Sequence, residues 1–248
     1  DAVQLLLAKL QGPVAKEFAM GALDSEDAKL RDLVLETVTS QGALRDKEVF
    51  AKAFATTQKE GVPEKLKPGA IRRALPKKDA AAQLSALIES TGDQETLRRS
   101  VVEIQNLNKP ELLGPALSRM EKLGMLQDNK GLPWFSGAVL AKHIESADGE
   151  DLVRALRLVW LKPGLTRHTA KTVEARMAHA DPAIRSIVAR IIPDAVKYEG
   201  MQSELGEQVL SARLAVETDP AVKGEIEESL SQVRQARHSD QTLTPVTP

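Results

Sequence analysis

The sequence predicts an all-α fold, built from antiparallel helix pairs that stack as a right-handed α-solenoid. Aromatic residues make up only 3% of the 248 residues, and the chain is rich in the helix formers Ala, Leu, Glu, Lys, Arg and Gln. Three helices open at Asp27, Asp181 and Asp219, each with apolar residues seven and eleven positions after the aspartate. Asp219 lies 38 residues after Asp181, and Asp27 precedes Asp181 by close to four such steps. A fixed period of this size indicates stacked supersecondary units.

Glycine, proline and N-cap residues divide the N-terminal half into helices. Gly12 and Pro13 end a first short helix, and the run Asp24–Asp27 supplies N-cap candidates for a later one. The expected helices cover residues 14–23, 27–42, 45–60, 79–90, 94–107 and 109–123. Residues 61–79 are expected to form an irregular basic insertion with one or two short helices, because several prolines and glycines interrupt it.

The C-terminal half is the more regular part, above all over residues 147–237. The expected helices cover residues 134–146, 150–161, 166–180, 182–198, 201–217 and 220–237. Their short connections predict antiparallel neighbours, so we expect residues 1–237 to form a single solenoid domain.

Residues 238–248 are expected to form an extended tail or linker, because they are rich in threonine and proline and show no helical period. A polar tail of this kind becomes ordered only against a surface. We expect residues 239–248 to dock on a neighbouring chain.

The three helix openings resemble those of the HEAT-repeat family, in which second helices commonly begin with Asp-Pro-x-apolar-Arg. The matching residues are Asp181, Pro182 and Arg185; Asp219 and Pro220, with Lys223 in place of arginine; and Asp27 and Arg31, without the proline. Weaker echoes lie around Arg98 and Arg154. The resemblance implies a polar ladder, in which each aspartate caps its own helix and accepts from the arginine of an adjacent repeat. A cap with a merely solvated arginine is the alternative.

The resemblance also implies a function, because the second helices of such repeats line a concave surface. The expected partner-binding residues are Arg31, Arg98, Arg154, Arg185 and Lys223. We therefore expect a non-catalytic protein–protein interaction scaffold, a subunit or accessory protein of a larger assembly. A helical spacer within a larger multidomain enzyme is the first alternative.

A basic segment supports a second alternative, nucleic-acid binding. It contains Lys65, Lys67, Arg72, Arg73, Lys77 and Lys78. Such a cluster could contact phosphates, although a solvated irregular loop is the favoured explanation. The whole chain has a net charge of −1, which is unlike a general nucleic-acid binder, so nucleic acid is not the expected partner.

The residues give no support for catalysis or cofactor binding. The chain has no cysteine, which excludes disulfides and thiolate chemistry, and none of its four histidines forms a closely spaced metal-binding pair. We expect no catalytic, cofactor-binding or metal-ligating residues. Neither Trp134 nor Trp160 is followed one turn later by the acid that HEAT-like DNA glycosylases place near such residues, which argues against that activity. Beside Phe135 at a helix start, Trp134 is expected to pack between repeats, and Trp160, in an apolar run, is expected to lie in the core.

No apolar run reaches the roughly 20 residues of a transmembrane helix. The compartment stays open between extracytoplasmic and cytoplasmic. The absence of cysteine and of an initial Met favours a mature exported chain.

Overall fold

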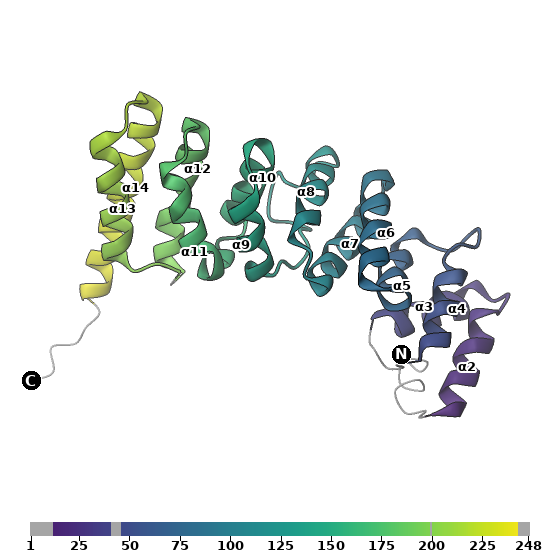
Figure 1. The fold of residues 1–248 in the computed structure, drawn as a ribbon. Helices are drawn as coiled ribbons and strands as arrows, with labels where there is room; N and C mark the ends of the chain where they lie inside the picture. Colours follow the sequence, from purple (N-terminus) through teal and green to yellow (C-terminus); the bar gives the residue numbers. More distant parts are fainter. Residues whose placement is uncertain (1–11, 41–45, 199, 243–248) are drawn as a thin grey trace, which may run out of the picture. The chain divides into compact units, whose positions relative to one another are not determined.

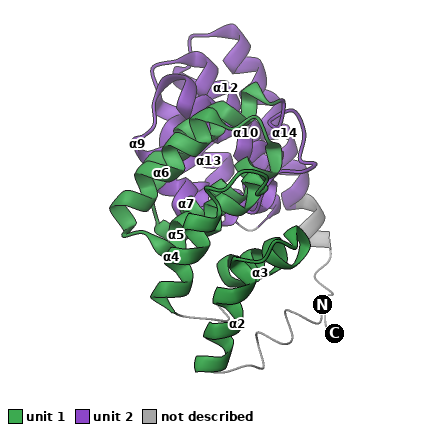
Figure 2. Cartoon of the chain, turned by 90° about the vertical axis from the view of Figure 1, so that its right-hand side faces the viewer, with its two compact units in different colours: residues 1–123 green, residues 124–248 purple. Residues whose placement is uncertain are grey.

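The computed structural model describes residues 12–40, 46–198 and 200–242, and these are helical with no strand among them (Figure 1). The all-α prediction is confirmed. Contacts divide the chain into two compact units, residues 1–123 and 124–248 (Figure 2). The single solenoid over residues 1–237 stays a prediction.

In the first unit, each helix packs against helices close to it in the sequence. Its helices are α2 (Pro13–Leu23), α3 (Ala28–Ser40), α4 (Lys47–Thr56), α5 (Lys67–Ala74), α6 (Lys77–Ser90), α7 (Gln94–Leu107) and α8 (Leu113–Lys122), with 3₁₀ turns at Glu64–Leu66 and Pro110–Leu112. Helix α2 contacts α3 and α4, and α5 contacts α4, α6 and α7. Asp46 and Asp93 cap α4 and α7 through their carboxylates.

In the second unit, alternate helices form a row. Its helices are α9 (Gly137–Ser146), α10 (Gly149–Leu161), α11 (Thr166–Ala175), α12 (Pro182–Lys197), α13 (Ser203–Val216) and α14 (Pro220–Thr242), with 3₁₀ turns at Pro163–Leu165 and Arg176–Ala178. Helix α12 packs against both α10 and α14, while α9 packs against α11. Because α10, α12 and α14 are neighbours in this row, residues from all three helices lie side by side on one face of the second unit.

The last helix is longer than the sequence predicts. Helix α14 continues to Thr242, so residues 238–242 are helical and not extended. Polar residues are compatible with an exposed helix, and the first proline after Pro220 is Pro245, so nothing earlier stops α14. Residues 243–248 lie outside the described residues, and their docking on a neighbouring chain stays a prediction.

Across the described ranges, no helix combines the length and the apolar character needed to cross a membrane.

Helices α9 and α11 approach closely at Gly137. A Cβ added to Gly137 would lie 2.5 Å from Cβ of His168, which is much closer than two carbon atoms can approach. Gly224, in α14, has no such neighbour within 4 Å. The two glycines therefore offer a matched test of the packing in this unit.

We predict that Gly137→Ala lowers the free energy of unfolding by about 1–3 kcal/mol, because the added methyl group overpacks the contact with His168. Gly224→Ala should instead raise it by about 0.5–1 kcal/mol, because alanine is the better helix former. Urea unfolding followed by circular dichroism measures both. A Gly137→Ala protein as stable as Gly224→Ala would contradict the close packing of α9 on α11.

Candidate interaction groove in the second unit

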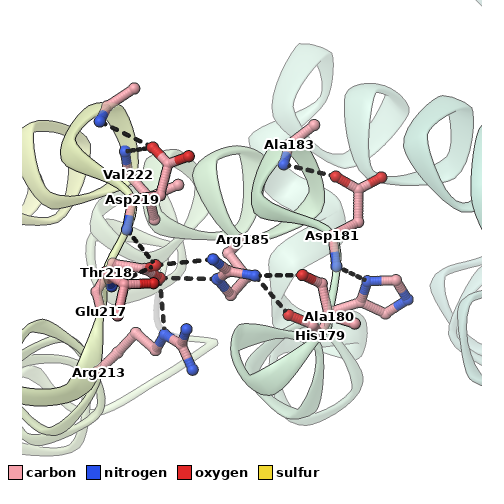
Figure 3. Close-up of polar contacts among 11 residues, drawn as sticks. His179, Ala180, Asp181, Ala183, Arg185, Arg213, Glu217, Thr218, Asp219 and Val222 are labelled. Atoms are coloured by element: carbon pink, nitrogen blue, oxygen red, sulfur yellow. Dashed lines mark hydrogen bonds and ion pairs between the residues drawn. The ribbon is translucent and has the colours of Figure 1, made fainter.

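A buried ion pair joins the start of α12 to the end of α13 (Figure 3). Arg185 is only 6% exposed, and its Nε and one terminal nitrogen donate to the two carboxylate oxygens of Glu217, each at 2.7 Å. The other terminal nitrogen donates to the carbonyls of His179 at 2.8 Å and Ala180 at 2.6 Å. The guanidinium is thus hydrogen-bonded on both sides.

Glu217 collects further donors from its own surroundings. Arg213 Nε donates to it at 2.9 Å, and the backbone N–H groups of Thr218 and Asp219 each donate at 3.0 Å. The hydrogen bonds from Arg185 hold the pKa of Glu217 far below its ordinary value, with Arg213 and the backbone donors adding to them against the opposing effect of burial. The buried carboxylate is therefore ionised.

The expected caps are present, but the expected pairing of an aspartate with the arginine of an adjacent helix pair is not formed at Asp219. Asp27, Asp181 and Asp219 each cap their own helix, as their carboxylates accept from backbone N–H groups two residues on. Arg185 does not bind Asp219, however, but Glu217, two residues earlier. The segment from Glu217 to Pro220 therefore has both roles. The carboxylate of Glu217 pairs with Arg185, and the carboxylate of Asp219 caps α14.

This geometry corrects one expected partner-binding residue. Arg185 is buried and fully engaged within the chain, so it does not face a partner. Arg31, Arg98 and Arg154 each form an ion pair with an acidic residue of their own helix. Lys223 is exposed.

The basic segment is more ordered than the sequence predicts. Arg72 pairs with Glu103 of α7, and Arg73 donates to the carbonyl of Thr39 at 3.3 Å while lying 5.7 Å from the ring centre of Phe50. These arginines hold α5 against its neighbours. Among the other cations of the segment, Lys65, Lys77 and Lys78 are exposed, and Lys67 is half-buried.

The expectation that both tryptophans pack inside is wrong. Trp134 is 65% exposed and Trp160 is 46% exposed. Trp134 precedes α9, and its neighbour Phe135 takes the buried position. Trp160 lies in the last turn of α10, where Leu158 and Val159 fill the core instead.

Trp160 borders a groove across the row of α10, α12 and α14. The groove has a volume of about 390 Å³. It is lined by Trp160 from α10, Arg190 and Asp194 from α12, and Glu225, Glu228, Ser229 and Gln232 from α14. The guanidinium of Arg190 donates to both carboxylate oxygens of Glu225, and this ion pair links α12 to α14. The groove therefore lies on helices that already contact one another.

Asp194 is the distinctive charged group of the groove. Its side chain is half-buried, and within the described residues no hydrogen bond to its carboxylate is formed. Burial raises the pKa of Asp194, and the nearby charge of Lys197 opposes this rise only in part. Asp194, Glu225 and Glu228 face a single cation, Arg190, so the lining is negative when they are ionised.

Trp134 borders a separate hollow of about 420 Å³, between α9 and α11. Lys162 lies on its wall and donates to the carbonyls of Pro133 at 2.9 Å and Leu132 at 3.4 Å. Burial lowers the pKa of Lys162. These hydrogen bonds fix the loop before α9, which gives this lysine a structural role.

The side chains of the described residues form no group of three or more His, Asp or Glu placed to hold a metal ion. His143 is buried, His168 is exposed, and His179 contacts Asp148 through Nε2 at 3.1 Å.

No protein-family model and no curated protein matches the sequence. A solved structure similar to this chain is the crystal structure of an engineered protein. The two share 16% sequence identity with a TM-score of 0.35, over 88% of this chain and 96% of the other.

We predict that Glu217→Gln lowers the free energy of unfolding by about 3–5 kcal/mol, because it leaves the buried guanidinium of Arg185 without its counter-charge. The control is Glu150→Gln, which removes the exposed partner of Arg154 and should cost less than about 0.5 kcal/mol. Chemical unfolding of the two variants and the wild type compares them. Equal losses would show that the Arg185–Glu217 pair is no more important than a surface pair.

The same pair should make stability depend on pH. The pKa of Glu217 is lower in the folded chain than its usual value of 4.5, so the stabilisation is complete above that value and is lost as the pH falls below it. We predict that the stability difference between wild type and Glu217→Gln narrows on acidification, by up to about 1.4 kcal/mol per pH unit. Urea unfolding of both proteins from about pH 6 to about pH 3 measures the difference. A constant difference would refute the prediction.

Proposed function

We propose that this chain is a non-catalytic protein–protein interaction scaffold made of HEAT-like helix pairs, and that it serves as a subunit or accessory protein of a larger assembly. The observation that carries the proposal is the groove across α10, α12 and α14, with the exposed indole of Trp160 on its wall. Tryptophan is strongly enriched among the residues that dominate binding energy at protein interfaces. Covering this indole would bury a large apolar surface that the described chain leaves in water.

The rigidity of the groove also supports binding. Three helices form its walls. The ion pair of Arg190 with Glu225 joins α12 to α14 directly. The buried ion pair of Arg185 with Glu217 joins α12 to the segment just before α14. A surface whose helices are already held together loses less conformational entropy when a partner docks.

The repeat interpretation is supported by the two best-matching helix openings. Asp181 and Asp219 are 38 residues apart in the sequence. Asp181 caps α12, and Asp219 caps α14. Adjacent helices of this row pack against each other, as stacked repeats require. A right-handed solenoid over the whole chain is part of the proposal.

Photo-crosslinking tests the proposed function directly. We predict that a benzoylphenylalanine in place of Gln232, an exposed residue of the groove lining, forms a discrete adduct between the full chain and a protein of the native source. The matched control places the same residue at Val216, which is 66% exposed on α13 and does not line the groove. Trp160→Ala should also lose the partner on co-purification. No adduct at position 232, or the same adducts at both positions, would refute an interaction site at the groove.

A further inference from the structure

The groove at Trp160 has walls of two kinds that together specify one type of occupant. One kind is the half-exposed indole of Trp160 on α10, whose aromatic face attracts cations. The other kind is formed by the carboxylates of Asp194 on α12 and Glu228 on α14. An occupant that satisfies both walls needs a positive charge and a flat surface.

The cation already present does not supply that charge. Arg190 is held by both oxygens of Glu225, so its guanidinium neutralises that carboxylate. Gln232 donates to Glu228 at 3.4 Å, a long contact that leaves most of the accepting capacity of Glu228 unused. The carboxylate of Asp194 accepts no hydrogen bond within the described residues, and Asp194 lies half-buried on α12.

Charge complementarity therefore selects against acidic ligands. With Arg190 balanced by Glu225, the remaining charges on the lining are those of Asp194 and Glu228, both negative. Lys197 lies near Asp194 but does not line the groove, and its ammonium is 5.7 Å from the ring centre of Tyr198. A phosphate or an acidic peptide would be repelled, and a cationic peptide would be attracted.

We propose that this groove binds an arginine side chain of a partner protein, with the guanidinium stacked on Trp160 and hydrogen-bonded to Asp194. The proposal rests on the proposed function and names the chemistry of the partner at that site. The volume of about 390 Å³ lies within the range of small-ligand sites and accommodates one such side chain.

Arginine fits this groove better than lysine for two reasons. Its guanidinium is planar, so it can stack on an indole while its edge donates to a carboxylate. It is also more weakly hydrated than an ammonium group, so it loses less solvation when it enters a half-buried site. The groove should therefore distinguish the two cations.

The test uses the full-length chain and a short blocked peptide with two arginines separated by glycine and serine. Matched peptides carry lysine or glutamate in place of arginine. Calorimetric titration measures the affinity for wild type, Trp160→Ala, Asp194→Asn and Glu228→Gln. The control is Glu227→Gln, which removes an exposed charge from the same helix next to Glu228 but outside the groove. Fluorescence of the Trp134→Phe protein, in which Trp160 is the single tryptophan, locates the binding.

We expect saturable binding of the arginine peptide with a change in Trp160 fluorescence. Trp160→Ala and Asp194→Asn should each weaken this binding about tenfold or more, Glu228→Gln should weaken it less, and Glu227→Gln should leave it unchanged within about twofold. The lysine peptide should bind more weakly than the arginine peptide, and the glutamate peptide should not bind.

The proposal is overturned if the arginine peptide does not bind, if lysine binds equally well, or if Glu227→Gln weakens binding as much as Asp194→Asn. These outcomes are separate from the crosslinking test. A protein adduct at position 232 without peptide binding would refute the arginine assignment and keep the interaction site. Failure of both experiments would refute the site itself.

Discussion

The second unit depends on the ion pair of Arg185 and Glu217. Removing two charges from water is costly, and the cost is recovered only when the remaining donors and acceptors are also satisfied. Here Arg185 also donates to the carbonyls of His179 and Ala180, and Glu217 also accepts from Arg213 and two backbone N–H groups. Because these partners come from the end of one helix and the start of another, the pair fixes the connections before α12 and α14 together.

The position of the groove follows from this fixed alignment of α12 with α14. Arg190 lies on the same helix as Arg185 and meets Glu225, which follows the cap residue Asp219 by less than two turns. Asp194 is one turn after Arg190, while Glu228 and Gln232 continue the face of α14 that begins at Glu225. Aligning the first turns of α12 and α14 thus also aligns the side chains that line the groove further along both helices.

Much of the fold follows from local signals in the sequence, whereas the candidate site does not. Helix α7 begins and ends where the sequence predicts, because Asp93 caps it and Asn108 ends it in the left-handed conformation with a φ of 54°. The run from Leu156 to Trp160 is apolar at nearly every position, so periodicity alone could not show that Trp160 faces outward. The pairing of Arg185 with Glu217 joins residues 32 positions apart, and no local rule distinguishes Glu217 from Asp219 as its acceptor.

The same limit applies to the cations that the sequence suggests for partner binding. A sequence shows where cations lie but not which of them already have partners. Arg72, Arg73 and Arg185 are bound within their own unit, whereas Lys65, Lys78 and Lys223 are exposed. The division has a physical cause, because a planar guanidinium can satisfy several acceptors at once in a partly dry site, while an ammonium keeps its strong hydration by staying in water. Arg185 satisfies several acceptors at once within this chain. An arginine of a partner protein at Trp160 would do the same between two molecules.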